Sequence, residues 1–517
     1  MMGCDRGEEE SPPVAAPPLT PQQEHGRDVW LHSTFGGEKF FSLILPEAPF
    51  NLRLGFDALL ATPRSQRFTQ WGAINDPDCT DGDGTTGFDR CTDPHATGIV
   101  GVRKFANPLP VGPRVLFGVA CASCHAGLDP ARPPDDPNHP SWANIHLTTG
   151  NQYFDIAKIF NAHLSPSDPR WQVFHTWARG TVDTTVLETD HINNPSIITQ
   201  IFNLPDRPYF HLHDDGMPTT VHRMGFGGED DVGCQKAALR VYFNIGMCAA
   251  ECMVGHLANG PNGSQTPIDL AQCRRDCPEF RDAERNIPDL CAFLDTARPP
   301  KLPARYIDHA VVDRGKQVFL RACSHCHSNG RPIGRRNVLS NDLLHRAPGF
   351  GLEPPGAVGT NSCRARTTNW QAGHIWATFS SDEKKALGPG YYRNVPLLAV
   401  WATAPFLHNN RLGDFNGDPS IAGRLAAYDD AMDQLLNPGR RDFLGSIQRT
   451  TQAIVLPTPL GGVPLPAGTP VAAFANLDPA NPLDNLCPDL VENEGHWFGA
   501  SLSASDKHAL KEFLKTQ

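Results

Sequence analysis

The chain has 517 residues, of which 20% are charged, and its formal net charge is −11 at pH 7. This acidic balance argues against nucleic acid as a partner and against a polybasic membrane patch. Hydrophobic residues make up 40% of the chain, and 48 prolines with 46 glycines favour a globular protein of helices joined by long irregular loops. The length corresponds to about two to four domains.

The first 25 residues are rich in Glu, Pro and Gln and hold almost no large apolar side chains, which predicts a disordered tail at 1–25. An apolar segment typical of an export signal is not found there. Gly3-Cys4 resembles the end of a bacterial lipoprotein signal, which would make Cys4 a lipid anchor; the alternative is an unpaired cysteine in a flexible tail. No run of about 18 apolar residues occurs, so we predict no transmembrane span.

An acidic loop follows between Asp76 and Asp93, where six aspartates stand among glycines. Cys79 and Cys91 lie within it, and we expect them to close it as a disulfide. Oxygen ligands at this density could hold Ca²⁺, but the spacing of an EF-hand is absent. A solvated acidic loop is the preferred interpretation, with a calcium site at Asp76 to Asp93 as the alternative.

Cys121-Ala-Ser-Cys124-His125 is the first of two short motifs with C-x-x-C-H spacing. In this spacing two thiols bond the vinyl groups of a haem and the next histidine reaches its iron. The cysteines hold the macrocycle on one helical turn, so the imidazole approaches the metal from one fixed side. A redox dithiol or half of a zinc site is the alternative, because C-x-x-C alone is common.

The second motif is Cys323-Ser-His325-Cys326-His327. His325 stands between the two cysteines, where the turn directs it away from the iron, so His327 is the expected ligand. Two copies, each with histidine directly after the second cysteine, favour two covalently bound haem c groups over the alternatives. One haem in each domain is the simplest partition.

Apolar and aromatic spacing predicts helices in four internal segments. These segments are 151–160, 171–177, 285–296 and 313–319. The Pro-rich stretch 297–303 ends the third helix and predicts a linker at 299–304. We therefore divide the chain into an N-terminal haem domain at 26–298 and a C-terminal haem domain at 305–517.

Fifteen cysteines are many for a reduced compartment. Two pairs with i, i+4 spacing, at 248 and 252 and at 273 and 277, each lie on one helical face. Two antiparallel helices could then be joined by Cys248–Cys277 and Cys252–Cys273. A metal site is the alternative there, although thiol pairs with this spacing are unusual for zinc. Further candidate pairs are Cys234 with Cys291 and Cys363 with Cys487.

Disulfides and covalent haem both require export, so we expect a periplasmic or secreted protein with a signal peptide upstream of Met1. Residues 503–516 predict a capped final helix, with Ser503 before Asp506 and an apolar stripe of Leu510, Phe513 and Leu514. The pattern of residues 290–296 matches that of 510–516, so each haem domain is expected to end in an equivalent helix.

The second motif and the final helix resemble a class I cytochrome c domain, in which the first and last helices cross beside the haem. The predicted fold is therefore mainly α with long irregular loops: a tandem of two class I cytochrome c-like haem domains with insertions.

The sixth ligand of each iron decides its reactivity. A haem with a second protein ligand mainly transfers electrons, whereas an open one can bind oxygen or peroxide. The apolar segment 394–407 runs into His408, where an imidazole could approach a buried macrocycle. We assign His408 as the second axial ligand of the His327 haem, and a structural loop histidine is the alternative.

No comparable partner stands out for His125. Met247 could ligate the first iron and abolish oxygen chemistry. Other candidates, each favoured as a surface or packing residue, are Met217, Met224, His191, His211, His213, His222 and His256. Three tryptophans could lie between the haems and assist electron exchange, although core packing is favoured for each: Trp370, Trp376 and Trp401.

The segment 394–410, Asn-Val-Pro-Leu-Leu-Ala-Val-Trp-Ala-Thr-Ala-Pro-Phe-Leu-His-Asn-Asn, resembles the di-haem cytochrome c peroxidase superfamily. Segments 118–130, 240–246 and 495–499 are similar to its di-haem rubber oxygenase branch. The resemblance covers most of residues 28–517. It implies a dioxygen-binding haem at His125, the reactive iron's proximal ligand, and an electron-transfer haem held by His327 and His408. The chain is shorter than those oxygenases, and the aromatic residues of their distal pocket have no assigned counterpart here.

Three functions follow as hypotheses. The first is an oxygenase that cleaves an unsaturated, polyisoprene-like substrate, the second a reductase of hydrogen peroxide, and the third an electron carrier with both irons closed. A redox partner protein or a small-molecule electron donor is expected, with an apolar substrate or peroxide for the enzymes. The shared haem anchors do not identify the substrate.

Overall fold

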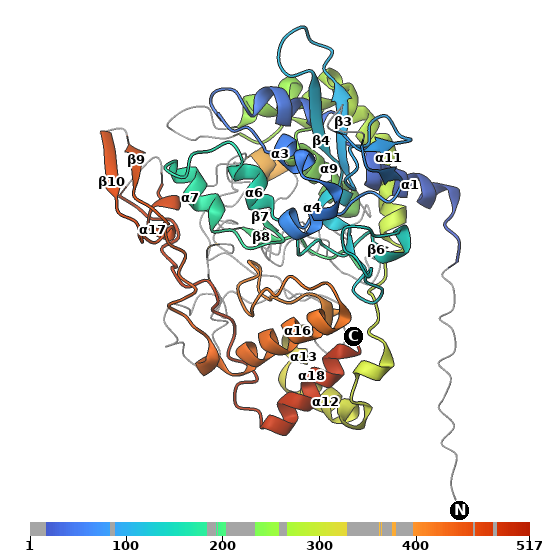
Figure 1. Ribbon diagram of the computed structural model, residues 1–517, viewed down its shortest axis with the longest axis vertical. Helices are drawn as coiled ribbons and strands as arrows, with labels where there is room; N and C mark the ends of the chain where they lie inside the picture. Colours follow the sequence, from blue (N-terminus) through green and yellow to red (C-terminus); the bar gives the residue numbers. More distant parts are fainter. Residues whose placement is uncertain are drawn as a thin grey trace, which may run out of the picture.

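The computed structural model describes most of the chain in separate ranges. They are 17–82, 88–183, 193, 195–202, 233–257, 266–327, 361, 363, 375–378, 397–458, 461–478 and 483–517, without the side chains of 233, 325, 326, 376 and 377. Helices dominate these residues, and the strands form five antiparallel two-stranded sheets. Figure 1 shows the early elements above and α12, α13, α16 and α18 below.

The helices before residue 300 are α1 (Pro21–His32), α2 (Gly37–Lys39), α3 (Phe56–Ala61), α4 (Arg64–Trp71), α5 (Ala122–His125), α6 (Ile156–Asn161), α7 (Pro169–His175), α9 (Gly233–Asn244), α10 (Leu270–Asp276) and α11 (Pro278–Leu294). Those after it are α12 (His309–Ala322), α13 (Ser324–His327), α16 (Ile421–Leu436), α17 (Ala472–Ala475) and α18 (Ala504–Lys515). Single 3₁₀ or π turns are η1 (Phe40–Ile44), η2 (Trp142–Asn144), η5 (Ala249–Met253), η6 (Val254–His256), η7 (Ala304–Tyr306), η8 (Ile375–Thr378), η10 (Val400–Ala402) and η11 (Pro438–Arg440).

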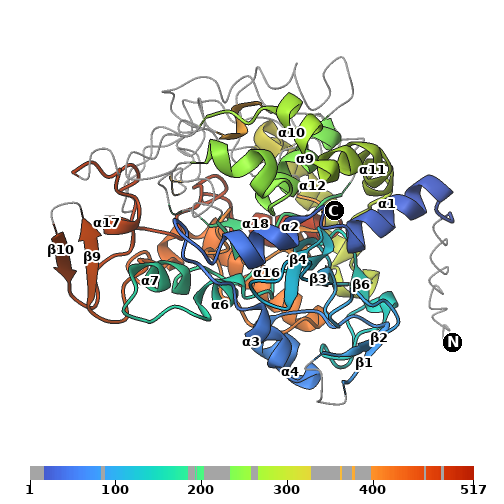
Figure 2. The same ribbon diagram turned by 90° about the horizontal axis from the view of Figure 1, so that it is seen from above.

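The strands pair in chain order. They are β1 (Cys79–Thr80) with β2 (Arg90–Cys91), β3 (Val102–Ala106) with β4 (Val115–Val119), β5 (Gly127–Leu128) with β6 (Ile145–His146), β7 (Thr181–Val182) with β8 (Ser196–Ile197), and β9 (Ile454–Thr458) with β10 (Gly461–Leu465). The β9–β10 hairpin contacts α7 and lies at the edge opposite α1 (Figure 2). The sequence did not predict these hairpins.

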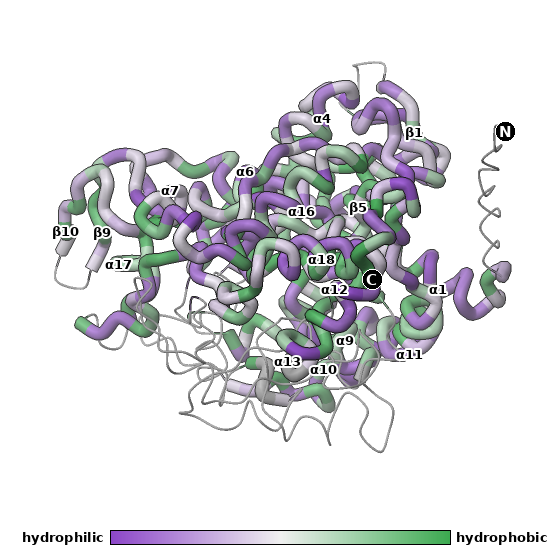
Figure 3. The backbone as a smooth tube through the Cα atoms, turned by 90° about the horizontal axis from the view of Figure 1, so that it is seen from below, coloured by the Kyte–Doolittle hydropathy of each residue, from purple (hydrophilic) through white to green (hydrophobic). Residues whose placement is uncertain are grey.

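Buried apolar side chains form two large clusters. One contains residues between Val29 and Leu294 together with Ile375. The other contains residues between Leu302 and Leu514 together with Phe202. Leu302 lies in the predicted linker, so this segment packs against the second cluster. Hydrophilic and hydrophobic residues alternate along the backbone in Figure 3, as expected for helices that bury one face.

A helix crossing with a glycine at its contact point occurs in each half. In the first, α1 packs on α11, and a Cβ added at Gly26 would lie 1.9 Å from the Asp289 carbonyl oxygen. In the second, α12 packs on α18, and a Cβ at Gly315 would lie 1.9 Å from the Ala509 carbonyl oxygen. A side chain at either glycine would force the helices apart, so glycine permits the close approach. The tandem cytochrome fold itself stays a prediction.

Several predicted boundaries need correction. The prediction of a disordered tail at 1–25 is wrong at its end, because α1 begins at Pro21 behind a capping box formed by Thr20 and Gln23. The helix predicted at 285–296 is α11, which begins earlier, at Pro278, with the Cys277 side chain as its N-cap. The helix predicted at 151–160 is the shorter α6, the one predicted at 171–177 is α7, which has the same length but begins two residues earlier, and the one at 313–319 extends to become α12.

The final helix agrees with its prediction. Ser503 caps α18, and its hydroxyl accepts a hydrogen bond from the Asp506 backbone at 3.1 Å. The predicted stripe of Leu510, Phe513 and Leu514 is buried.

All five predicted disulfides are confirmed. They are Cys79–Cys91, Cys234–Cys291, Cys248–Cys277, Cys252–Cys273 and Cys363–Cys487. The metal alternative for the twin pairs is therefore wrong. Cys4 lies outside the described residues.

Across the described ranges, no single helix has both the length and the apolar character needed to cross a bilayer. One bent pair, Cys234–Asn244 with Ala249–His256, meets these criteria at an angle of 95°.

Candidate haem-binding sites

The first motif forms one helical turn directly after a hairpin. Strand β4 leads into α5, with Cys121 at the N-cap, and the His125 amide donates to the Cys121 carbonyl at 3.1 Å. Gly101 supports this turn with a φ of +72°, and a Cβ there would lie 2.2 Å from the Ser123 nitrogen. The Asn151 amide donates to the Cys124 carbonyl at 2.8 Å. The two thiols and the imidazole are thus held on one short element, as a covalent haem requires.

The motif cysteines differ from the others in the chain. Ten cysteines form disulfides, whereas Cys121 and Cys124 of the first motif are free thiols. Burial raises the pKa of Cys121 to about 12 and raises the pKa of Cys124. Reactive dithiols rely on lowered thiol pKa values, so this environment argues against a redox dithiol. The side chain of Cys326 is outside the described residues.

An iron-binding histidine needs a hydrogen bond from its other ring nitrogen to fix the orientation of the ring, and His125 has one. Its Nδ1 lies 2.9 Å from the Thr199 carbonyl oxygen, and because a carbonyl only accepts, Nδ1 carries the proton. The lone pair is then left on Nε2, the nitrogen that would bind iron. Burial lowers the pKa of His125 to about 4, which keeps the imidazole neutral at pH 7. The Trp30 ring lies 5.7 Å away and packs against it.

Tyr242 is a site residue that the sequence did not single out. It lies in α9 with its side chain fully buried, and its hydroxyl has no oxygen or nitrogen partner among the described residues. The polar group beside it is the Cys121 thiol, and burial holds the pKa of Tyr242 well above its usual value. The hydroxyl therefore lies beside the sulfur that would form a thioether bond to the first haem. The residues around the first motif therefore fit a haem.

The second motif follows α12 without a gap. The Cys323 amide continues the helix by donating to the Phe319 carbonyl at 2.8 Å, and the His327 amide donates to the Cys323 carbonyl at 3.1 Å. His327 therefore lies at the end of α13, which follows α12, the helix that packs on α18. The side chain of His325 is not described.

His496 is the histidine whose ring contacts that of His327, with the ring centroids 6.4 Å apart. Burial, His327 and Arg441 together lower the pKa of His496 to about 3, so its imidazole is neutral. Its Nδ1 has no hydrogen-bond partner within the described part of the chain. Arg441 fixes the backbone here by donating to the carbonyls of Gly495 at 2.7 Å and His496 at 3.0 Å. In the sequence His496 lies between Gly495 and Gly499, a pattern that does not by itself predict an iron ligand.

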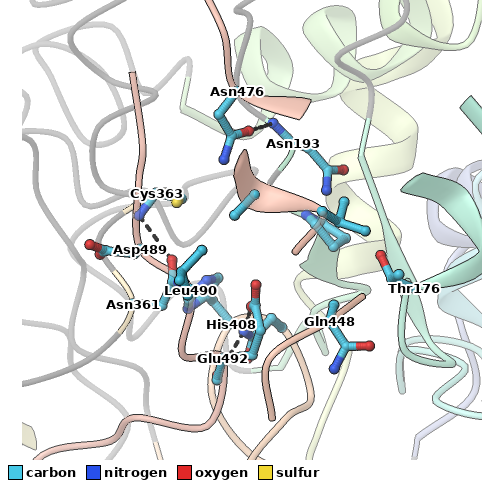
Figure 4. A pocket seen from close by; sticks show the side chains of 14 residues that line it. Thr176, Asn193, Asn361, Cys363, His408, Gln448, Asn476, Asp489, Leu490 and Glu492 are labelled. Atoms are coloured by element: carbon cyan, nitrogen blue, oxygen red, sulfur yellow. Dashed lines mark hydrogen bonds between the residues drawn. The ribbon is translucent and has the colours of Figure 1, made fainter. Parts of the chain in front are cut away.

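His408, the ligand that the sequence predicts, is 8% exposed and lines a small polar pocket (Figure 4). The pocket has a volume of about 20 Å³, and Glu492, Asp489 and Cys363 also line it. Burial raises the pKa of Glu492 to about 6, although Arg411 and Asn409 oppose the shift. The His408 carbonyl accepts from Ile197 of β8 at 2.6 Å, which ties this loop to the first half.

Some of the other residues that the sequence offers as axial ligands or as electron-transfer groups lie within the described ranges, and the rest lie outside them. Met247 is fully buried in the first cluster, and His256 bonds to Thr266 at the surface. Trp401 is buried in the second cluster. The candidates outside the described residues are Met217, Met224, His191, His211, His213, His222, Trp370 and the side chain of Trp376.

The acidic loop uses its carboxylates within the protein. Asp89 bonds to Arg64 at 2.6 Å and Arg67 at 2.7 Å, and Asp78 accepts from the Trp142 indole at 2.9 Å. The described residues contain no three-ligand metal cluster in this loop. A calcium site here stays a prediction.

Neither a scan against models of protein families nor a search of curated proteins finds a match to this chain.

Proposed function

We propose that this protein is an extracytoplasmic di-haem c-type cytochrome oxidoreductase. The observation that carries the proposal is the state of the first motif. Its two cysteines remain unpaired in a chain that pairs ten others, and the Nδ1 of His125 is engaged by the Thr199 carbonyl. This combination fits thioether attachment together with iron ligation through Nε2.

The residues have separate tasks in this proposal. Cys121 and Cys124 tether the first macrocycle, and the Thr199 carbonyl fixes the tautomer and orientation of His125. Trp30 packs beside the imidazole. When bound, haem iron supplies electron transfer and, where one axial face is open, a binding place for a small molecule such as dioxygen or peroxide.

The two haems have different roles in the proposal. Cys323, Cys326 and His327 hold the second, and a second histidine closes it, so that it transfers electrons. The sequence assigns that histidine as His408, whereas ring proximity to His327 favours His496. The first haem is the reactive one, and cleavage of an apolar unsaturated substrate with dioxygen is the reaction we propose for it.

The test combines two spectra of the exported protein. A pyridine haemochrome assay is expected to give two haems c per chain, and carbon monoxide is expected to bind one of them after reduction. Cleavage of polyisoprene with uptake of dioxygen would support the oxygenase. Peroxide-dependent oxidation of a reduced cytochrome would instead identify the protein as a peroxidase. Absence of carbon monoxide binding would leave an electron carrier, and absence of covalent haem would overturn the proposal.

A further inference from the structure

Arg441 is a buried arginine in the segment that follows α16 and η11. It is 5% exposed, and the buried Glu494 supplies a nearby negative charge. A guanidinium has only hydrogen-bond donors, and each buried donor without an acceptor costs free energy. Four backbone carbonyl oxygens accept hydrogen bonds from Arg441. The side chain therefore links two segments of backbone that lie far apart in the sequence.

Two of these carbonyls belong to the last turn of α16. The Nε of Arg441 donates to the Gln434 oxygen at 2.9 Å, and one Nη donates to the Leu435 oxygen at 2.9 Å. The final carbonyls of a helix have no partner within the helix, so a side chain that binds them caps it. Met432 and Leu436 anchor α16 in the second cluster of buried apolar side chains. The guanidinium is thereby fixed to a buried helix.

The other two carbonyls belong to Gly495 and His496. One Nη donates to the Gly495 oxygen at 2.7 Å, and the Nη that binds Leu435 also donates to the His496 oxygen at 3.0 Å. Each Nη carries two hydrogens, so one guanidinium can serve all four acceptors. A Cβ at Gly495 would lie 3.2 Å from the Leu435 side chain, so this segment also packs closely on α16. Asn493 adds a hydrogen bond to the Asp442 carbonyl at 3.1 Å.

We propose that Arg441 is a positioning residue for the second axial ligand of the His327 haem. The proposal rests on the proposed function, with His496 as that ligand. The ring of His496 lies 6.4 Å from the ring of His327 and 5.7 Å from that of Phe498. By holding the His496 backbone against the end of α16, Arg441 restricts where this imidazole can lie. A loop that is already ordered loses less conformational entropy when its side chain binds, so the link favours ligation.

Arg441→Gln tests this role against two control variants in the haem-loaded protein. Asn437 also donates to a carbonyl of the last turn of α16, that of Asp433, at 2.8 Å. Asn437→Ala therefore loosens the same helix end but leaves the bonds to residues 495–496 in place. Arg440 is the exposed neighbour of Arg441 and pairs with Asp433 at 2.8 Å, so Arg440→Gln controls for the loss of one positive charge.

A carbon monoxide titration of the reduced protein measures how firmly the second haem keeps its sixth ligand. In Arg441→Gln, the concentration that half-saturates this haem is expected to fall by about tenfold or more, because losing one hydrogen bond from a charged donor already corresponds to roughly that factor. Both controls keep the wild-type value. Arg441→Lys keeps the charge but not the fork, gives an intermediate value, and replaces Arg441→Gln if that variant fails to fold. A folded Arg441 variant with the wild-type value would overturn the positioning role.

Hydrogen exchange measured by mass spectrometry gives a second readout that does not depend on haem. In Arg441→Gln, the amides of residues 492–499 are expected to exchange about tenfold faster or more, whereas Asn437→Ala leaves their exchange unchanged. Unchanged exchange in Arg441→Gln would overturn the link itself. A chain without covalent haem would refute the proposed function, while the exchange measurement would still decide whether Arg441 holds the His496 segment.

Discussion

The two halves share a helix crossing but reach their motifs differently. In the second half the first residue of the motif directly follows α12, the helix that crosses α18. In the first half the motif at 121 is far along the sequence from α1, which ends at His32, and it follows the hairpin β3–β4. Four of the five disulfides also lie in the first half. A motif that follows a long insertion needs covalent links to hold it in place, whereas a motif that directly continues a helix does not.

The two predicted ligand histidines differ accordingly. His125 takes its orienting hydrogen bond from Thr199, a residue distant in sequence, whereas the ring contact of His327 comes from His496. The first half thus shows how its imidazole is oriented, and the second half shows a candidate for the other axial position. The division between a reactive and an electron-transfer haem stays a proposal.

The largest effect is expected from removing the thioether cysteines of one half. Cys121→Ala with Cys124→Ala should leave one haem per chain instead of two, because each motif holds its own macrocycle. Cys323→Ala with Cys326→Ala is the matched variant. Haemochrome absorbance and intact mass count the haems. If carbon monoxide binding survives in the first variant and disappears in the second, the assignment of the reactive haem to the first half is wrong.

Replacing the second axial ligand should change the spin state of one haem. His496→Ala is expected to convert the second haem from low to high spin and to add a second carbon monoxide site. His408→Ala is the matched control, with a low-spin spectrum retained. Magnetic circular dichroism or electron paramagnetic resonance reports the change. The opposite result, with His408→Ala opening the haem, would restore the assignment made from the sequence.

We expect the four disulfides of the first half to contribute more to the unfolding free energy of that half than Cys363–Cys487 contributes to that of the second half. Replacing Cys248 and Cys252 by serine removes two links that close loops of 29 and 21 residues. Each is expected to cost about 3 kcal/mol of unfolding free energy on a chain-entropy estimate. Calorimetry with each haem band as a local probe checks which half unfolds first. Unfolding of the second half first in this variant would contradict the comparison.

Local patterns predicted local features well. The i, i+4 cysteines identified the twin disulfides, and Ser503 with Asp506 identified the start of α18. Thr20 and Gln23 carried the signal for α1, but the polar composition of the tail concealed it. Whether His408 or His496 approaches an iron is a tertiary question, since both are loop histidines beside small or apolar residues. The register of β3 against β4 likewise depends on which two strands pair, and a single apolar segment of the sequence does not show that.

The smallest effect tests whether the two helix crossings are equivalent. Alanine at Gly26 or Gly315 would place a Cβ 1.9 Å from a carbonyl oxygen of the partner helix, whereas alanine at Gly439 meets nothing within 4 Å. Separating the helices should cost about 1–3 kcal/mol, partly offset by the better helix propensity of alanine. Chemical denaturation measures this cost, with Gly439→Ala as the control. A loss for Gly315→Ala without one for Gly26→Ala would show that only the second half depends on its crossing, and that the covalent links of the first half replace it.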